Sequence, residues 1–168
     1  HFDTIFVVGS HNIFQSGYAP MKQHENILIF CNGKPKFNPQ FVKRNEAGAK
    51  RAKYIHNPSN TGKREFIGNF IATKTKKYNP DLKNPYSIIY FNNDVGLHPT
   101  QKPLNLFKYL IETYTDKDEL VLDNCLGSGT TARACKDLGR KCIGIEINQS
   151  YCDIAIKRLG QEVFNFYD

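Results

Sequence analysis

The sequence predicts an α/β protein built around a parallel sheet, and three observations lead to this prediction. The 168 residues have about the length of one domain, and 40% of them are hydrophobic, which suffices for a packed core. Short apolar runs of strand length recur along the chain. In the last third, two such runs alternate with amphipathic helical patterns, an order typical of a βαβ unit with a right-handed crossover.

The first region, residues 1–32, contains two predicted strands. Residues 5–8 and 25–30 are short apolar runs, a pattern typical of strands that are buried on both faces. The second run ends at Asn32-Gly33, a turn signal. We therefore assign residues 1–32 to terminal strands of the sheet.

The middle region, residues 33–85, is predicted to be an inserted, loop-rich lobe. It is rich in Asn, Lys, Gly and Pro, and its weak periodicity predicts no long helix or strand. From Gly33 to Pro85 the chain carries thirteen Lys and Arg residues against three acids. This region therefore has a net charge of +10, whereas the whole chain has only +7.

Such a charge asymmetry is expected where a polyanion binds. Lys and Arg contact phosphates, and the Asn, Gln and aromatic residues interleaved here suit base contacts. The region is thus a candidate for binding a nucleic acid such as double-stranded DNA, although a basic, solvated insertion without a partner stays open. The candidate DNA-binding residues are Lys43, Arg44, Lys50, Arg51, Lys53, Lys63, Arg64, Lys74, Lys76 and Lys77.

The last region, residues 86–168, is predicted to form an α/β unit. Residues 86–91 form a strand, and Pro103 opens a helix because proline suits a first helical turn. Apolar residues recur at helical spacing along that helix and make one face. The predicted order is helix 103–114, strand 119–123, a turn at Gly127-Ser128-Gly129, helix 130–138 closed by Gly139, strand 142–146 and helix 149–159.

Composition excludes several other classes of protein. No apolar run approaches the roughly 20 residues of a membrane span, and residues 1–8 lack the features of a signal peptide. Five cysteines without a C-x-x-C pair indicate reduced thiols buried as small apolar residues in a cytoplasmic protein. The five histidines are scattered, so we predict no metal site and no membrane partner.

The glycine turn predicts a ligand site. Asp123 ends one predicted strand, and Glu146 ends the next, 23 residues later, so the two strand ends should lie side by side. A carboxylate on the second strand can accept both hydroxyls of a ribose. Glycines let a ligand approach the backbone, and the helix N-terminus favours an anionic group. A structural βα turn without any ligand is the alternative.

The chemistry of the turn favours S-adenosylmethionine over a dinucleotide. A pyrophosphate would be poorly placed beside Asp123, whereas the ammonium of S-adenosylmethionine would be well placed there. Its carboxylate would then face the helix end. The glycine fingerprint of dinucleotide-binding proteins is also incomplete, because its third position is occupied by Ala132.

Several sequence blocks resemble a known family. His98-Pro99-Thr100-Gln101-Lys102-Pro103, followed by Asp123–Thr131 (DNCLGSGTT) and Gly144-Ile145-Glu146, is similar to the N4-cytosine/N6-adenine DNA methyltransferase family. Residues 22–30 and Asn38-Pro39-Gln40 resemble further blocks of that family. The order of the blocks matches the permuted arrangement in which the cofactor motifs are C-terminal and the recognition region lies between the halves.

The resemblance implies a Rossmann-like fold of S-adenosylmethionine-dependent methyltransferases, here incomplete, with an inserted basic lobe. It implies S-adenosylmethionine as cofactor, and transfer of its methyl group to the exocyclic amine of adenine (N6) in DNA. Cytosine (N4) is the alternative target. The cofactor-binding residues implied are His98, Pro99, Thr100, Gln101, Lys102, Asp123, Asn124, Cys125, Gly127, Ser128, Gly129, Thr130, Glu146 and Asn148.

The chain departs from the family pattern at two places. Many members have Pro-Phe where Asn124-Cys125 stands here. The catalytic tetrapeptide, Asp-Pro-Pro-Tyr or Ser-Pro-Pro-Tyr, is absent, so no catalytic residue is assigned. In the family that tetrapeptide follows the strand beside the one that ends at Asp123, so we expect an uncovered edge there.

These departures leave several hypotheses open. The sequence lacks an initiator Met and starts within a predicted strand, so we expect a partial sequence whose catalytic half lies upstream, or a second chain that supplies it. A catalytically inactive fragment or subunit that binds DNA or cofactor is the second hypothesis. A nicotinamide-dependent Rossmann enzyme is the third, but it gives the HPTQKP block no role.

Overall fold

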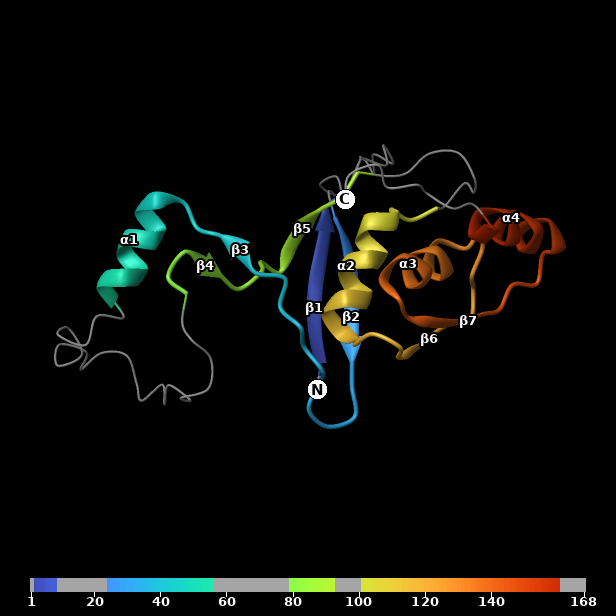
Figure 1. Cartoon of the computed structure of the whole chain (residues 1–168), viewed down its shortest axis with the longest axis horizontal. Coiled ribbons are helices and arrows are strands. Elements are labelled where there is room, and N and C mark those ends of the chain that lie inside the picture. Colours follow the sequence, from blue (N-terminus) through green and yellow to red (C-terminus); the bar gives the residue numbers. More distant parts are fainter. Residues whose placement is uncertain (1, 9–23, 56–78, 93–100, 161–168) are drawn as a thin grey trace, which may run out of the picture. The chain divides into compact units, whose positions relative to one another are not determined.

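The computed structural model describes residues 2–8, 24–55, 79–92 and 101–160. The chain divides into two units, which Figure 1 shows as ribbons. The first unit comprises His1–Asn38 and Tyr86–Asp168, and the second comprises Pro39–Pro85.

A three-stranded sheet opens the first unit. Its central strand β1 (Phe2–Val8) pairs antiparallel with β2 (Glu25–Phe30) and parallel with β5 (Ile88–Tyr90). The predicted strands are confirmed, and the range of β2 agrees at both ends, whereas β5 is shorter than residues 86–91. The prediction of burial on both faces is wrong for β2. Leu28 and Phe30 are 52% and 72% exposed, and Ile27 and Ile29 are half-buried, because β2 is antiparallel and presents only one face inward.

The predicted βαβ unit is confirmed in the C-terminal part. Strand β6 (Leu120–Asp123) leads through helix α3 (Thr130–Leu138) to strand β7 (Lys141–Gly144), and helix α4 (Gln149–Gly160) follows. Strands β6 and β7 are parallel, with Asp123 opposite Gly144. The helix prediction for residues 130–138 and its end at Gly139 agree with α3, whose last turn is closed by Gly139 at φ 67°.

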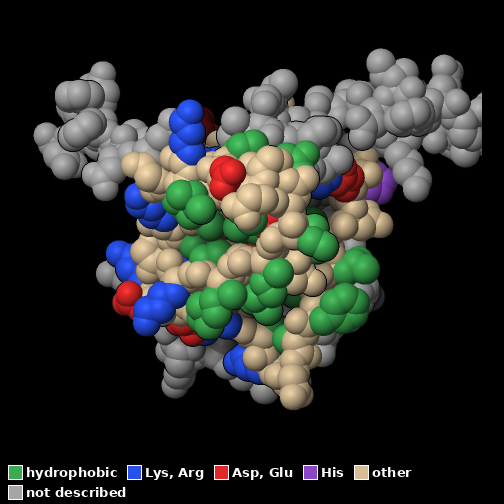
Figure 2. Space-filling model, turned by 90° about the vertical axis from the view of Figure 1, so that its right-hand side faces the viewer, with side chains coloured by type: hydrophobic (Ala, Val, Ile, Leu, Met, Phe, Trp, Pro, Cys, Tyr) green, Lys and Arg blue, Asp and Glu red, His purple; other side chains and the backbone are tan. Residues whose placement is uncertain are grey.

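Two helices cover one face of β6 and β7. Helix α2 (Leu104–Tyr114) begins one residue after Pro103, packs beside α3 and brings Ile111 into contact with the buried Ala134 and Cys135. Val121 and Cys142 meet this cluster from the strands. The opposite face of the two strands is apolar, and Figure 2 views the molecule from this side. The side chains on this face are at least half exposed; they are Leu120, Leu122, Ile143 and Ile145.

Asn38 ties the segment after β2 to the end of α2. A helix end leaves carbonyls without partners inside the helix. The Asn38 backbone N–H donates to the Thr113 carbonyl at 2.7 Å, and its side-chain amide donates to the carbonyls of Glu112 and Thr115 at 3.3 and 3.1 Å. Asn38, at the point where the chain leaves the first unit, thus caps the C-terminal end of α2.

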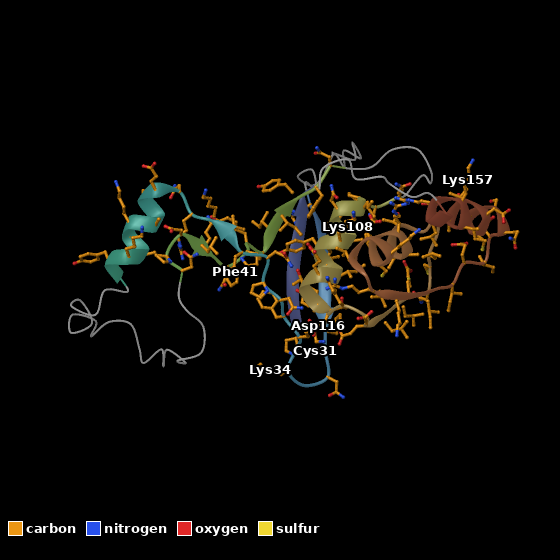
Figure 3. The ribbon with its side chains drawn as sticks, in the orientation of Figure 1. Cys31, Lys34, Phe41, Lys108, Asp116 and Lys157 are labelled. Carbon is orange, nitrogen blue, oxygen red and sulfur yellow. The ribbon has the colours of Figure 1, made fainter. Side chains whose placement is uncertain are left out.

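A surface ion-pair cluster lies beside this cap. Lys36 pairs with Asp116 at 2.8 Å and with Glu119, and Figure 3 labels Asp116 just beyond α2. Hydrogen bonds from Lys36 lower the pKa of both carboxyl groups below their ordinary values of 3.8 and 4.5. The same bonds raise the pKa of Lys36 above 10.5. Because all three groups are solvent-exposed, their contribution to stability is small.

The substitution Lys36→Gln is expected to flatten the pH dependence of stability. The lowered carboxyl pKa values mean that the cluster stabilises the fold above about pH 4.5 and loses this effect as the pH falls through the lower folded-state values. The raised lysine pKa means that the effect is also lost as the pH rises above 10.5. Urea unfolding of wild type and variant between pH 2 and 7 measures the difference. Parallel curves over that range would contradict the assignment.

The second unit contains a helix that the sequence did not predict. Helix α1 (Glu46–Ile55) lies between β3 (Val42–Lys43) and β4 (Leu82–Lys83), which pair antiparallel. The helix is capped by Asn45, whose side-chain oxygen accepts the Gly48 N–H at 2.9 Å. The local signals for this helix are an Asn cap, an acid in the first turn, three separate alanines and a lysine in the last turn. The Gly, Pro and Asn content of the surrounding region favours loops and masks these signals.

Among the described helices, none is long and apolar enough to cross a membrane.

Candidate functional site

The ends of β6 and β7 bring Asp123 and Glu146 to one edge of the parallel pair. The Ile145 N–H donates to the Asp123 carbonyl at 2.8 Å, and the Leu126 N–H donates to the Ile145 carbonyl at 2.9 Å. These bonds extend the pairing past the last residues of the two strands. The strand predicted for residues 142–146 is observed as Lys141–Gly144, so Glu146 lies two residues beyond β7. Asp123 and Glu146 nevertheless lie at adjacent strand ends, as their spacing predicted.

Asp123 organises the start of the glycine turn. Its Oδ2 accepts a hydrogen bond from the Thr131 hydroxyl at 2.5 Å, and its Oδ1 accepts the Cys125 N–H at 3.0 Å. The carboxylate is half-buried and is held by one contact from the turn and one from α3. Its position is thus fixed before any ligand binds.

Glu146 bridges the two loops that follow the strands. Its Oε2 accepts the Gly127 N–H at 2.8 Å, and its Oε1 accepts the Asn148 N–H at 2.8 Å. Carboxylate oxygens can each accept more than one hydrogen bond, so these contacts are compatible with further donors such as hydroxyls. Glu146 fixes the loops and also presents a negative charge at the edge of the site.

The glycine turn adopts a conformation that only glycine takes at low cost. Gly127 and Gly129 have φ values of 55° and 82°. A Cβ on Gly129 would lie 2.8 Å from the Cβ of Ala155 and 3.1 Å from its Cα. Gly129 is also the N-cap of α3, and among the described residues no side chain caps this helix end. The first N–H groups of α3 can therefore serve an anionic ligand.

The segment before α2 reaches the glycine turn. The Ser128 hydroxyl donates to the Gln101 side-chain oxygen at 3.4 Å, and Ser128 is only 3% exposed. Lys102, in contrast, forms an ion pair with Glu25 of β2 at 2.6 Å. Two blocks far apart in sequence, the one containing Gln101 and the one containing Ser128, therefore meet at one place.

A mostly apolar cavity of about 390 Å³ lies between β7 and α4. Glu146 lines it together with Leu126, Gly144, Ile145, Ala155 and Ile156. The cavity thus combines one acceptor group with apolar walls, a combination suited to a flat apolar ring that carries hydroxyl groups.

The structure gives other predicted site residues different surroundings. Asn124 and Cys125 are exposed, and Thr130 is 7% exposed at the start of α3. The Asn148 side chain accepts the N–H and the hydroxyl of Ser150 at 2.9 and 2.6 Å, which makes it the cap of α4. His98, Pro99 and Thr100 lie outside the described residues.

The five cysteines differ in burial, so the sequence prediction holds only in part. Cys135 is fully buried, and burial raises its pKa to about 12; burial also raises the pKa of Cys142. Cys31, Cys142 and Cys152 are half-buried and Cys125 is exposed, so the prediction of five buried thiols holds in full for Cys135 alone; Cys125 lies on the loop that leaves the sheet. In the described ranges, no three His, Cys, Asp or Glu side chains gather as a metal site would require.

The family model N6_N4_Mtase, a DNA methylase family, matches residues 3–157. The chain belongs to the N6/N4 DNA methylase family. Its HPTQKP block, glycine turn and Glu146 lie within the matched range, and the structure brings Gln101, Ser128 and Glu146 to one side of the sheet.

Curated members of the family share this similarity. The chain is 33% identical over 160 residues to the type II methyltransferase M.HpaI of Haemophilus parainfluenzae, covering 90% of the chain and 42% of the relative. It is 49% identical over 78 residues to M.HindIII of Haemophilus influenzae, covering 46% of the chain and 25% of the relative. The chain thus spans less than half the length of these curated relatives.

Solved structures agree on the fold. The crystal structure of the M1.HpyAVI–SAM complex matches 95% of the chain and 63% of that protein, with a TM-score of 0.54 and 27% identity. A modification methylase of Thermus thermophilus, TTHA0409, matches at a TM-score of 0.54 with 20% identity over 98% of the chain and 57% of that protein. The chain therefore carries part of the Rossmann-like methyltransferase fold.

The described part of the basic lobe exposes four candidate DNA-binding residues. Lys43 lies on β3, and Lys50, Arg51 and Lys53 lie on α1. Lys53 is 3.6 Å from Asp81, and Arg44 is half-buried with its Nε donating to the Leu82 carbonyl at 2.9 Å. Arg44 therefore also helps to hold β3 and β4 together. The remaining candidates, Lys63, Arg64, Lys74, Lys76 and Lys77, lie outside the described residues.

Proposed function

We propose that this chain forms the cofactor-binding part of a DNA methyltransferase that methylates the N6 amine of adenine with S-adenosylmethionine. The observation that carries the proposal is the meeting of Asp123, the glycine turn and Glu146 at the ends of β6 and β7. Gln101 joins them through Ser128. The M1.HpyAVI–SAM complex, which shares the fold, supports the choice of cofactor.

The residues present fit each part of S-adenosylmethionine. Asp123 offers a carboxylate to the ammonium, and the uncapped N-terminus of α3 offers N–H groups to the carboxylate. Glu146 offers acceptors to the ribose hydroxyls. The apolar cavity beside Glu146 has room for an adenine ring. We propose that the other cofactor-binding residues predicted from the sequence also contact S-adenosylmethionine. Asn148 is left out because its side chain caps α4. Lys102 would contact the cofactor in addition to its ion pair with Glu25.

In this function the protein mainly aligns two reactants. The sulfonium of S-adenosylmethionine supplies an activated methyl group. Asp123 and Glu146, held by backbone N–H groups and by Thr131, fix the direction in which that methyl group would point. The target amine belongs to a base flipped out of the duplex. The catalytic tetrapeptide is absent from the 168 residues, so no residue here is assigned to the amine.

Calorimetry tests the first part of the proposal. The protein as its gene encodes it is titrated with S-adenosylmethionine and with ATP, a ribose-containing ligand without the amino-acid group. We expect saturable binding of the first ligand and at least tenfold weaker binding of ATP. Equal affinity for both ligands, or no binding of S-adenosylmethionine, rules out the proposed cofactor.

Nucleoside analysis tests the second part. Duplex DNA incubated with the protein and S-adenosylmethionine is digested and analysed by mass spectrometry. N6-methyl-2′-deoxyadenosine is the product expected. N4-methyl-2′-deoxycytidine would identify the alternative target, and the absence of both products despite cofactor binding would favour an inactive DNA- or cofactor-binding subunit. We propose that this reaction takes place in the cytoplasm, where DNA and reduced thiols occur together.

We further propose that the basic lobe binds the DNA backbone. In the described part of the lobe, eight Lys and Arg residues stand against Glu46 and Asp81, and both Lys50 and Arg51 are exposed on α1. Exposed cations at this density suit phosphate contacts, which fix the register of a protein on DNA.

The double substitution Lys50→Gln/Arg51→Gln is expected to weaken DNA binding without sequence preference. Each lost phosphate contact should lower the slope of log K against log salt by about 0.9. Fluorescence anisotropy with a duplex at several salt concentrations measures both effects. Lys157→Gln removes an exposed cation of α4, in the other unit, and should leave the slope unchanged. An unchanged slope in the double variant would exclude these contacts.

The uncovered side of β6 favours a further segment or chain as partner. In the part of the chain that the structure describes, β6 pairs only with β7, and Leu120 and Leu122 are 59% and 64% exposed. We propose that a segment carrying the catalytic tetrapeptide, from the same or a second polypeptide, pairs with this edge. The gene sequence upstream of His1 is a direct test. Hydrogen exchange of residues 120–123 in the protein as its gene encodes it should then be slow, and rapid exchange would contradict the pairing.

A further inference from the structure

We infer that Arg158 of α4 is a positioning residue that sets the glycine turn for the amino-acid end of the cofactor. This inference rests on the proposed binding of S-adenosylmethionine. The Arg158 Nη1 donates to the Thr130 hydroxyl at 3.0 Å and lies 3.4 Å from the Ser128 carbonyl. Thr130 and Ser128 are 7% and 3% exposed, so the guanidinium reaches an enclosed part of the turn.

The contact fixes a peptide plane. Because a peptide unit is planar and trans, its C=O and N–H groups point in opposite directions. In the unit between Ser128 and Gly129, the carbonyl faces Arg158, and the N–H donates to the Leu126 carbonyl at 3.1 Å. Both ends of this unit are therefore held. Since α3 begins directly after it, the direction of the uncapped N–H groups of α3 is set as well.

Arg158 is itself held in place by α3. The backbone carbonyl of Arg158 accepts a hydrogen bond from Arg133 at 3.2 Å, and the Leu159 carbonyl accepts one from Lys136 at 2.7 Å. These bonds cap the end of α4 with basic side chains of α3. About one turn before Arg158 in α4, Ala155 packs directly against Gly129. The last turns of α4 thus form a rigid support for the glycine turn.

The charge of Arg158 gives this support a preference for an anion. The N-terminus of α3 carries the positive end of the helix dipole, and the Arg158 guanidinium adds a full positive charge beside it. A carboxylate at this helix end would be attracted by both, whereas a ligand without a carboxylate would gain nothing from Arg158. A residue that only stabilised the fold would affect both ligands equally.

Two ligands separate these roles. S-adenosylhomocysteine carries the amino-acid group, and 5′-methylthioadenosine lacks it but keeps the adenosine. Calorimetry of the protein as its gene encodes it, with both ligands, is repeated for Arg158→Gln. We expect about a 10- to 100-fold loss of affinity for S-adenosylhomocysteine, the range for losing a hydrogen bond to a charged group, and less than a twofold change for 5′-methylthioadenosine. Arg158→Lys, which keeps the charge, should recover part of the loss.

The matched control is Lys157→Gln, which removes the neighbouring charge. Lys157 is exposed, and Figure 3 shows it pointing away from α4. This variant should bind both ligands like the wild type. If the wild type binds both ligands, the inference is overturned by an equal loss of affinity for both ligands in Arg158→Gln, or by no loss of affinity for either. Failure of the wild type to bind either ligand overturns the proposed function, and the inference falls with it. If Arg158→Gln does not fold, Thr130→Val removes the acceptor hydroxyl and should show the same ligand selectivity.

Discussion

Replacing Gly129 with alanine is expected to unfold the glycine turn and to abolish cofactor binding. The backbone at Gly129 has a φ of 82°, which costs roughly 1–2 kcal/mol for a residue with a Cβ. The new Cβ would also lie 2.8 Å from the Ala155 Cβ and 3.1 Å from the Ala155 Cα, and such overpacking costs roughly 1–3 kcal/mol. We expect a total loss of about 2–5 kcal/mol in the free energy of unfolding, measured with urea.

Two variants divide this loss into its causes. Gly139 has a φ of 67°, but a Cβ there would meet nothing within 4 Å. The substitution Gly139→Ala should therefore show only the backbone term. Adding Ala155→Gly to Gly129→Ala removes the closer of the two Ala155 contacts and should recover part of the crowding term. If Gly129→Ala lowers the free energy of unfolding no more than Gly139→Ala does, then close contact with Ala155 of α4 does not restrict position 129.

Replacing Glu146 with glutamine is expected to have the second-largest effect, although the side-chain shape is unchanged. Both carboxylate oxygens accept backbone N–H groups, from Gly127 and from Asn148. A glutamine must place its NH₂ group opposite one of these donors, so one N–H loses its acceptor. Hydrogen bonds to charged groups contribute roughly 1.5–3 kcal/mol, and we expect a loss of stability in this range.

Cofactor affinity should fall further than stability in the Glu146→Gln variant. The same oxygens are proposed to accept hydrogen bonds from the ribose hydroxyls. We therefore expect the dissociation constant for S-adenosylmethionine, measured by calorimetry, to rise about 10- to 100-fold. Asp153→Asn removes a negative charge from an exposed position of α4, where the Gln149 side chain donates to the carboxylate at 2.9 Å. That control should bind like the wild type. Wild-type affinity in Glu146→Gln would exclude a role for Glu146 in the ligand site.

The C-terminal part of the fold could be predicted from sequence because its signals are local and agree with one another. Gly139 ends α3 at a positive φ, and the strand on each side of α3 is short and apolar. The Asp123 and Glu146 pair followed from the geometry of parallel strands alone. The contact between Gln101 and Ser128, in contrast, was implied only by the family resemblance.

Other features depend on contacts that no local pattern reveals. The alternating exposure of β2 follows from its antiparallel pairing with β1, which is a property of the sheet and not of the strand. Arg158 and Ala155 were missed because they reach the glycine turn from α4, and Arg158 lies 28 residues after Thr130 in the sequence. An arginine near the end of an amphipathic helix is ordinarily read as a solvated charge.

The exposed thiol in the loop after β6 gives the molecule a natural place for a reporter group. Cys125 is the exposed one of the five cysteines, whereas Cys135 and Cys142 are shielded by burial that raises their pKa values. Its backbone N–H is bonded to Asp123, so a fluorophore attached to Cys125 would sit beside the carboxylate without replacing any residue. Ligand binding at the site could then be followed by fluorescence without any substitution in the sequence.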